Sequence, residues 1–457
     1  MVFLAIEWAS VGVKVLQFIL SFSILVVLHE LGHFLPARWF KCRVEKFYLF
    51  FNPGFSLFKK KIGDTEYGVG WIPFGGYVKI SGMIDESMDK EQMALPPQPY
   101  EFRSKPAWQR LIIMLGGVTV NVLLAFAIFI MVMWVWGENY IPVANLKYGL
   151  YADSLGRRMG MQDGDNIIAV AGKPLERQGS AGSEMIMNEA KTVTVTRNGQ
   201  TLDLTVPVGI IGQLNKNRLG GLSIIRFPEV IDSVMPWAKI TSGDLRRGDT
   251  LIAMNGHRIQ FASDQIKDTG FQHMRQIMSN HLVVVRNGHD TVNVVMERNL
   301  AKDSALGIRY MAADSILGNK HISYTFFQAV PAGVHKAIET LSNYIRNLKL
   351  LFTSKEVKAQ DSLGSVISIA GIFPSIWDWQ SFWMLTGIFS ILLAFMNVLP
   401  IPALDGGHAL FTLVEMISGR KPSDKFIEYA QMVGMILLFS LMAYALGLDI
   451  FHVFGHK

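Results

Sequence analysis

The stretch VLQFILSFSILVVLHELGH, residues 15–33, carries no ionisable side chain until it reaches His29, Glu30 and His33. Positions four apart on a helix share one face, so the imidazoles of His29 and His33 can bind the same metal ion while Glu30 flanks it. His-Glu-x-x-His on a helix predicts a zinc site with the glutamate as general base. Because ionisable groups at membrane depth are costly, they indicate a functional site. The stretch therefore predicts a metalloprotease whose chemistry takes place inside the bilayer.

Two alternatives explain the same stretch without such a site. A pattern this short can occur by chance in a soluble helix. Lys14 followed by an apolar run also matches the beginning of a cleaved signal peptide. No small-x-small cleavage site follows Leu28, however, because the metal motif stands there. We therefore favour the zinc site.

The composition indicates a membrane protein with sizeable polar parts. Half of the 457 residues are hydrophobic and 18% are charged. The third of the apolar stretches is short and ends before Pro400, which indicates a helix broken at membrane depth. The single Cys42 excludes an internal disulfide and can be an inert buried side chain. The stretches that can span a bilayer are residues 11–34, 111–136, 382–398 and 429–446.

The distribution of basic residues predicts the orientation of the chain. The formal net charge is +6, and basic side chains gather at both ends of the segment between the first two spans. The positive-inside rule places this segment in the cytoplasm, and the N-terminus, the central region and the C-terminus on the opposite side. No basic face with interleaved aromatics occurs, so we expect no nucleic-acid partner. The basic residues are Arg38, Lys41, Arg43, Lys46, Arg103, Lys105 and Arg110.

An internal repeat occupies the long region between the second and third spans. GDNIIAVAG at residues 164–172 recurs as GDTLIAMNG at residues 248–256, and VTVTRNG at residues 193–199 recurs as LVVVRNG at residues 282–288. Two matched pairs in the same order predict two copies of one domain, each with short strands and an Asn-Gly hairpin. The copies resemble bacterial PDZ domains, although the second departs before Gly248. Such domains either bind an extended peptide at a sheet edge or act as a steric gate, and we favour the gate.

A helix is predicted at residues 334–352, where apolar residues recur every three or four positions and charged residues fall on the other face. It can lie on the membrane surface, dock on the repeated domains, or pack against another helix.

The sequence NVLPIPALDGG, residues 397–407, supplies the rest of the predicted site. A catalytic zinc needs a third protein ligand and an open position for water. The two prolines interrupt a helix, and Asp405 between apolar segments is costly unless it binds a cation. His408 is a rival ligand, but one turn beyond Asp405 it is expected to pack or to hydrogen-bond nearby. Asn397 can donate to a substrate carbonyl or can cap the broken helix.

With these motifs in place, the whole chain resembles the site-two protease family of intramembrane zinc metalloproteases, of the RseP (regulator of sigma-E protease) type. The resemblance rests on His-Glu-x-x-His in the first span, tandem PDZ-like domains, and Asn-x-x-Pro-x-Pro-x-Leu-Asp-Gly in the third span. It implies that His29, His33 and Asp405 hold one Zn²⁺, that Glu30 is the catalytic base, and that Asn397 contacts the substrate.

Two segments depart from the family pattern. Many members have Gly-Pro-x-x-Asn in the second span, whereas this chain has GGVTVN at residues 116–121. The Gly-x-x-x-Asn spacing survives, and Gly117 can allow close helix contact. FNPGF at residues 51–55 stands where many members have Gly-Phe-Gly.

EYGVGWIPFGGYVKI, residues 66–80, predicts an apolar β-hairpin with its turn at residues 73–76. It resembles the membrane-reentrant β-loop of the family, and an ordinary cytoplasmic hairpin is the alternative. A free hairpin edge can pair with a substrate stretched across the zinc, with Val69, Gly70 and Trp71 as the expected contacts.

The resemblance implies hydrolysis of a peptide bond within the transmembrane segment of a previously trimmed single-span protein. An anti-sigma factor of envelope-stress signalling is the expected substrate, and signal-peptide remnants are a further one. The expected location is the bacterial inner membrane, surrounded by lipid, with the site toward the cytoplasmic side and the PDZ-like domains in the periplasm. A non-catalytic adaptor that displays PDZ domains and a membrane metal carrier are the rival classes.

The expected fold class is a polytopic α-helical membrane protein with four transmembrane helices, a membrane-associated β-hairpin and two periplasmic PDZ-like α/β domains. The expected segments are the first transmembrane helix with the zinc motif (1–36), a cytoplasmic segment (37–110) with the reentrant hairpin (about 63–82), the second helix (111–136), the first PDZ-like domain (137–215), the second (216–325), an amphipathic helix and connection (326–381), the third, broken helix (382–410), and the fourth helix and tail (411–457).

Overall fold

The computed structural model describes residues 8–83, 96–217, 220–267, 277–299, 306–362 and 366–454. Parts of several expected segments, including the beginning of the first and the end of the last, lie outside these residues. The contacts within the chain define two compact units. We call Met1–Gly137, Ser323–Leu348 and Leu363–Lys457 the membrane unit, and Glu138–Ile322 with Lys349–Ser362 the soluble unit.

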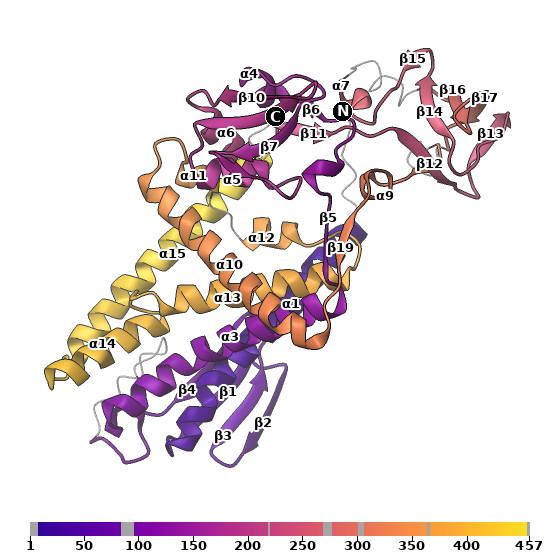
Figure 1. The fold of residues 1–457 in the computed structure, drawn as a ribbon. Helices are drawn as coiled ribbons and strands as arrows, with labels where there is room; N and C mark the ends of the chain where they lie inside the picture. The colour runs from indigo at the N-terminus through magenta and orange to yellow at the C-terminus, as the bar shows by residue number, and fades with distance from the viewer. Residues whose placement is uncertain are drawn as a thin grey trace. The chain divides into compact units, whose positions relative to one another are not determined.

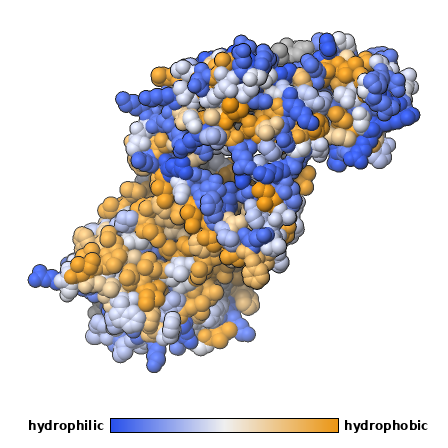
Figure 2. Space-filling model, in the orientation of Figure 1, coloured by the Kyte–Doolittle hydropathy of each residue, from blue (hydrophilic) through white to orange (hydrophobic). Residues whose placement is uncertain are grey.

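The membrane unit is built on long apolar helices (Figure 1). Among the described residues, four helices contain a segment long and apolar enough to cross a membrane. Figure 2 shows hydrophobic residues gathered over the surface of this unit, as expected where lipid replaces water. The four predicted apolar stretches thus lie on helices that are candidates for membrane spans. The helices are α1 (Trp8–Trp39), α3 (Ala107–Val135), α13 (Trp379–Val398) and α15 (Asp424–Phe454).

Glycines allow α1 and α3 to cross closely. A Cβ atom at Gly32 would lie 2.4 Å from the carbonyl oxygen of Gly116, and one at Gly116 would lie 2.0 Å from the carbonyl oxygen of Gly32. Small residues at such crossings let backbones approach, which favours helix association in lipid. The predicted zinc motif therefore lies where α1 meets α3.

The predicted amphipathic helix is α10 (Phe326–Thr353). Within the membrane unit it packs against α3, where Ala337 is buried beside Ala125 and Phe129. Of the alternatives left open by the sequence, packing against another helix is thus observed for this part of α10. The shorter helices α12 (Val366–Ile372) and α14 (Asp405–Ser418) belong to the same unit.

The segment after α1 forms a sheet with the strand order β2-β3-β1-β4. Strand β1 pairs with β3 in parallel and with β4 in antiparallel fashion. The predicted hairpin of residues 66–80 is therefore wrong, because β1 lies between β3 and β4 and the expected turn is part of β4. The strands are β1 (Val44–Phe51), β2 (Phe58–Ile62), β3 (Thr65–Val69) and β4 (Ile72–Ile80).

Gly70 explains this pairing. The connection from β3 to β4 crosses the end of β1, and a Cβ atom at Gly70 would lie 2.2 Å from the carbonyl oxygen of Phe51. The N–H of Trp71 donates to the same oxygen at 3.1 Å. A residue without a side chain lets the chain pass from one side of β1 to the other, so β4 becomes an edge strand of the sheet.

The soluble unit contains the two copies that the repeat predicts. In the first copy β7 (Asn166–Val170) pairs with β9 (Thr192–Arg197), and in the second β14 (Thr250–Met254) pairs with β16 (Ser279–Arg286). Both pairs are antiparallel, and the register shifts at the corresponding position of β7 and β14. The copies thus share a strand pairing and an irregularity, whereas their membership of the PDZ class stays a prediction.

Asn-Gly turns close the hairpins that follow. Asn198 and Asn287 have φ angles of 50° and 51°, and each is followed by a glycine with positive φ. Two successive left-handed residues form the turn that matches the twist of paired strands, and Asn-Gly is the sequence that adopts it most readily. The first hairpin leads into β10 (Gln200–Thr205) and the second into β17 (Asp290–Glu297).

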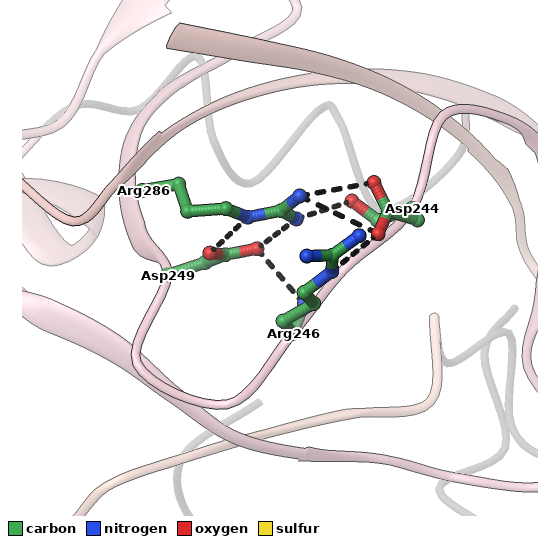
Figure 3. A network of polar contacts seen from close by, with 4 residues as sticks. All are labelled: Asp244, Arg246, Asp249 and Arg286. Atoms are coloured by element: carbon green, nitrogen blue, oxygen red, sulfur yellow. Dashed lines mark hydrogen bonds and ion pairs between the residues drawn. The ribbon is translucent and has the colours of Figure 1, made fainter. Parts of the chain in front are cut away.

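An arginine and an aspartate that recur in the repeat hold each copy together. Arg197 forms two hydrogen bonds of 2.8 Å to Asp165 in the first copy. Arg286 forms the corresponding pair with Asp249 at 2.9 and 2.8 Å in the second (Figure 3). Both aspartates are buried, so the guanidinium replaces the water that each carboxylate loses.

Candidate metal centre

Helix α1 and the N-terminal end of α14 bring the three predicted ligands together. His29 and His33 lie one turn apart on α1, and their Nε2 atoms are 3.3 Å apart. Oδ2 of Asp405, the first residue of α14, lies 3.2 Å from Nε2 of His29 and 3.3 Å from Nε2 of His33. Three ligand atoms from distant parts of the sequence thus form a nearly equilateral triangle.

This triangle fits a zinc ion. Tetrahedral ligands at about 2.0–2.1 Å from zinc lie about 3.3 Å from one another. Oδ2 of Asp405 is buried and has no hydrogen-bond partner in the described part of the chain, although two imidazole nitrogens lie close to it. A buried carboxylate oxygen needs a cation or a donor, and a metal ion shared with His29 and His33 supplies one. The fourth tetrahedral position then stays open, as catalytic sites require.

Helix α3 approaches the two imidazoles without a side chain between them. A Cβ atom at Gly117 would lie 2.4 Å from Nε2 of His33 and 2.7 Å from Nδ1 of His29. Gly117 therefore does more than bring two backbones together, because an alanine would push both rings out of place. The sequence indicated a close helix contact here but did not indicate that the contact is with the metal ligands.

The break after α13 places Asp405. Helix α13 ends at Val398 and α14 begins at Asp405, so the two prolines interrupt the helix as predicted. The broken segment packs tightly, since a Cβ atom at Gly434 of α15 would lie 1.9 Å from the carbonyl oxygen of Pro402. Asn397, near the end of α13, is buried with Nδ2 3.3 Å from Nε2 of His29. The structure thus brings Asn397 to the metal centre.

Glu30 faces a cavity of about 640 Å³ that also reaches His29, His33 and Asp405. The backbone of Val78 in β4 lies close to its carboxylate, and both residues line the cavity. A base must be within reach of the proton that it accepts, and Glu30 adjoins the ligands on the open side of the site. The cavity is therefore bounded by the metal centre on one side and by the edge strand on the other.

The edge strand contributes residues that the sequence did not single out. Gly76, Tyr77, Val78, Lys79 and Ile80 line the cavity. Burial raises the pKa of Tyr77 to about 12, so its hydroxyl stays protonated and donates to Oδ1 of Asn52 at 2.9 Å. The alternation of apolar residues predicted a strand here, but only the strand order identifies it as the edge at the cavity.

The predicted substrate contacts Val69, Gly70 and Trp71 lie at the end of β3 and in its connection to β4, and they are not among the residues that line this cavity. Val69 pairs with Leu49 on one side and with Phe58 on the other. Nε1 of Trp71 donates to the carbonyl oxygen of Pro53 at 3.0 Å. Val69 does not reach the cavity because β1 lies between β3 and the edge strand β4.

His408 is not part of the ligand cluster. Its Nε2 lies 2.6 Å from Nε2 of Gln431 on α15, and both residues line the cavity. This agrees with the expectation that His408 hydrogen-bonds nearby. Cys42, the single cysteine, is buried in an apolar cluster between α1, β4 and α3.

Apolar spanning helices together with a His-His-Asp site beside a glutamate define a multi-pass membrane metalloprotease. The family model described as "Peptidase family M50" matches residues 17–441, and the chain belongs to this family. This confirms the family predicted from the motifs.

Three relatives, each named "Putative zinc metalloprotease", match nearly the whole chain. The protein of Treponema pallidum is 27% identical over 92% of this chain and 95% of its own length. The protein of Vibrio cholerae is 27% identical over 94% and 97%, and that of Xylella fastidiosa is 25% identical over 93% and 96%. Family and relatives together support zinc as the metal of this centre.

Proposed function

We propose that this protein is an intramembrane zinc endopeptidase that cleaves within the transmembrane segment of a single-span protein. The observation that carries the proposal is the convergence of His29, His33, Asp405 and Glu30 on helices that can span a membrane. A non-catalytic adaptor has no use for a base beside a metal site, and neither has a metal carrier.

The residues around the centre have separate roles in hydrolysis. A zinc ion bound by the two histidines and Asp405 supplies Lewis acidity that activates water at neutral pH. Glu30 accepts the proton of the attacking water and passes it to the leaving amine. In this proposal the amide of Asn397, whose Nδ2 lies 3.3 Å from Nε2 of His29, donates to the substrate carbonyl oxygen as negative charge develops there. Val78 of β4 lies beside Glu30 in the wall of the same cavity.

Strand β4 provides a means of holding the substrate. A helical substrate hides its carbonyl groups in its own hydrogen bonds, so it must unwind before attack. Among the described strands of this sheet, β4 pairs only with β1, and its residues 76–80 line the cavity. Pairing with this edge gives an unwound segment new backbone hydrogen bonds with little demand on its sequence. We therefore assign substrate binding to residues 76–80 in place of 69–71.

The soluble unit acts in this proposal as a gate that excludes bulky proteins, with peptide binding by the PDZ-like copies as the alternative. A gate implies that the substrate is trimmed beforehand. The proposed substrate is an anti-sigma factor of envelope-stress signalling, with signal-peptide remnants as a further substrate. The proposed setting is the bacterial inner membrane, with the copies in the periplasm and the metal centre toward the cytoplasmic side.

The decisive experiment compares the wild type with Glu30→Gln in detergent, with zinc content and cleavage measured in the same sample. The model substrate is a single transmembrane segment, offered with and without a folded domain on its periplasmic side. We expect Glu30→Gln to retain zinc and to lose cleavage, and the wild type to cleave only the substrate without the domain.

The charge-matched control is Glu339→Gln, which changes an exposed glutamate on α10 and should leave cleavage intact. Chelation should abolish wild-type cleavage and added zinc should restore it. Cleavage by Glu30→Gln with zinc bound would show that the proposed mechanism is wrong, and equal cleavage of both substrates would contradict the gate.

A further inference from the structure

Asn121 on α3 touches the metal ligand His29 on the side away from the metal. Nδ2 of Asn121 lies 3.1 Å from Nδ1 of His29, and the asparagine is fully buried. Oδ1 of Asn121 has no hydrogen-bond partner among the residues that the structure describes. A buried amide directed at a ligand histidine in this way needs a physical explanation.

The chemistry of the imidazole decides how this contact must be arranged. His29 can bind a metal through Nε2 only if Nε2 keeps its lone pair, so the ring proton sits on Nδ1. Nδ1–H then needs an acceptor, which the nitrogen of an amide cannot provide. Rotating the amide by 180° exchanges Oδ1 and Nδ2, two atoms that are interchangeable in shape. In that orientation Oδ1 accepts a hydrogen bond from Nδ1–H of His29.

The second ligand histidine has an acceptor of the same kind. Nδ1 of His33 lies 2.8 Å from the carbonyl oxygen of Ile113, also on α3. Ile113, Gly117 and Asn121 are spaced by four residues, so they follow one face of α3. Along this face the carbonyl oxygen of Ile113 faces His33, and Gly117 leaves room for both rings. The amide of Asn121 faces His29.

We propose that Asn121 is a positioning residue of the metal centre: its amide oxygen accepts from Nδ1–H of His29 and aims Nε2 at the metal. Helix α3 contributes no ligand, yet it fixes the orientation of both ligand imidazoles. Acceptors of this kind set the tautomer and raise the basicity of a metal-binding histidine. Oγ of Ser390 on α13 donates to the backbone oxygen of Asn121 at 2.8 Å, which holds this part of α3 in place independently of the Asn121 side chain.

The test measures zinc affinity of the full-length protein by competition with a chelator. Asn121→Leu keeps the approximate volume of the side chain and removes the acceptor, so zinc affinity should fall about 10–100-fold. Asn121→Asp supplies a side chain that only accepts in its ionised form, and its affinity should stay within about threefold of wild type or exceed it. If Asn121 instead donated to Nδ1, the aspartate would weaken zinc binding at least as much as the leucine.

Thr119→Val is the matched control, because it removes a hydroxyl from an exposed position of the same helix. Absorption of the Co²⁺-loaded proteins is a second readout, since a misoriented His29 changes the ligand field at the metal. Should Asn121→Leu fail to fold, the comparison of Asn121→Asp with wild type still decides, because weakened binding by that folded variant contradicts the proposal.

This inference rests on the proposed zinc centre, and the two fail differently. Wild-type protein that binds no zinc would contradict the centre itself. Unchanged affinity and an unchanged Co²⁺ spectrum in Asn121→Leu would contradict only the role of Asn121.

Discussion

The membrane unit and the soluble unit both contain carboxylates removed from water, and the two units neutralise them differently. In the soluble unit Asp165 and Asp249 are 0% and 1% exposed, and each is paired with an arginine through two hydrogen bonds. In the membrane unit Asp405 faces His29 and His33, and the described residues offer its Oδ2 no hydrogen-bond partner.

The difference separates a structural carboxylate from a ligand. Removing a carboxylate from water costs several kcal/mol unless a positive charge and donors replace the water. The fold supplies both to Asp165 and Asp249, so these residues stabilise their domains and need nothing from outside. Among the described residues no arginine or lysine pairs with Asp405, and a metal ion held with His29 and His33 would complete its surroundings. A buried carboxylate without a positively charged partner among the described residues therefore indicates the candidate metal centre.

The two copies of the repeat also differ from each other. In the second copy Arg286 contacts Asp244 as well as Asp249, and Nε of Arg246 donates to Asp244 at 2.7 Å (Figure 3). The Arg286 guanidinium holds the pKa of Asp249 below its usual value, and the arginines Arg246 and Arg286 lower that of Asp244. The residues before Gly248, where the second copy departs from the first in sequence, thus extend the ion-pair network.

The largest effect on zinc binding is expected when Asp405 is replaced. Asp405→Asn removes a ligand charge, and zinc affinity should fall by at least about a hundredfold, more than for residues outside the ligand set. Zinc content and cleavage of the model substrate are the measurements. Asp378→Asn, at an ordinary helix N-cap, is the control that should keep zinc. Full zinc occupancy in Asp405→Asn would erase the distinction between the two kinds of carboxylate.

A smaller effect, confined to the soluble unit, is expected when the arginine is removed. Arg197→Met leaves Asp165 buried without its cation, which should lower the free energy of unfolding of the first copy by about 3–5 kcal/mol. Hydrogen exchange of β7 and β9 measures this loss. Zinc affinity should not change. Asp203→Asn changes an aspartate of the neighbouring strand β10 outside this ion pair and is the control. A change in zinc affinity without local unfolding would contradict the division into structural and ligand carboxylates.

The smallest effect concerns Glu229, a buried carboxylate of the second copy that has no arginine partner among the described residues. Burial raises its pKa to about 7, and the nearby Asp264 adds to the rise, while a hydrogen bond from Gln265 opposes it. The unfolded chain ionises from about pH 4.5. The stability linked to this group is therefore complete below pH 4.5 and is lost as the pH rises through about 7.

Glu229→Gln removes this dependence. Between pH 5 and pH 8 the free energy of unfolding of the second copy should be higher in the variant than in wild type, by on the order of 1–3 kcal/mol. Chemical denaturation at pH 5 and pH 8, monitored by hydrogen exchange of β12 (Glu229–Val234), measures this difference in stability. Asp249 has a lowered pKa, so its dependence on pH is the opposite. It stabilises the folded second copy at neutral pH, and this stabilisation is lost only as the pH falls below about 4. Equal stability of the variant and wild type at pH 8 would contradict the raised pKa.

The residues of the proposed metal centre could be predicted because local rules place them. His29 and His33 share a helix face by their spacing alone, and the prolines before Asp405 must break a helix wherever it lies. The repeat could be predicted because Gly-Asp and Asn-Gly turns require particular backbone angles, which the φ values of Asn198 and Asn287 confirm.

The sheet could not be predicted in the same way. The alternating apolar residues of β3 and β4 suit a hairpin as well as two strands separated by β1. The choice depends on the crossing of Gly70 over Phe51, a contact with a strand about twenty residues earlier in the chain. The substrate contacts predicted at Val69, Gly70 and Trp71 inherited this ambiguity.

The sequence by itself determined the family, the spans, the ligand types and the duplicated region, because each depends on periodicity or on residue chemistry within one segment. The tertiary structure alone decided which strand edge faces Glu30, and that Gly117 and Asn121 lie against the ligand imidazoles. These features arise where α1, α3 and β4 meet. Helix crossings and strand order bring together residues whose own neighbourhoods in the sequence carry no sign of the contact.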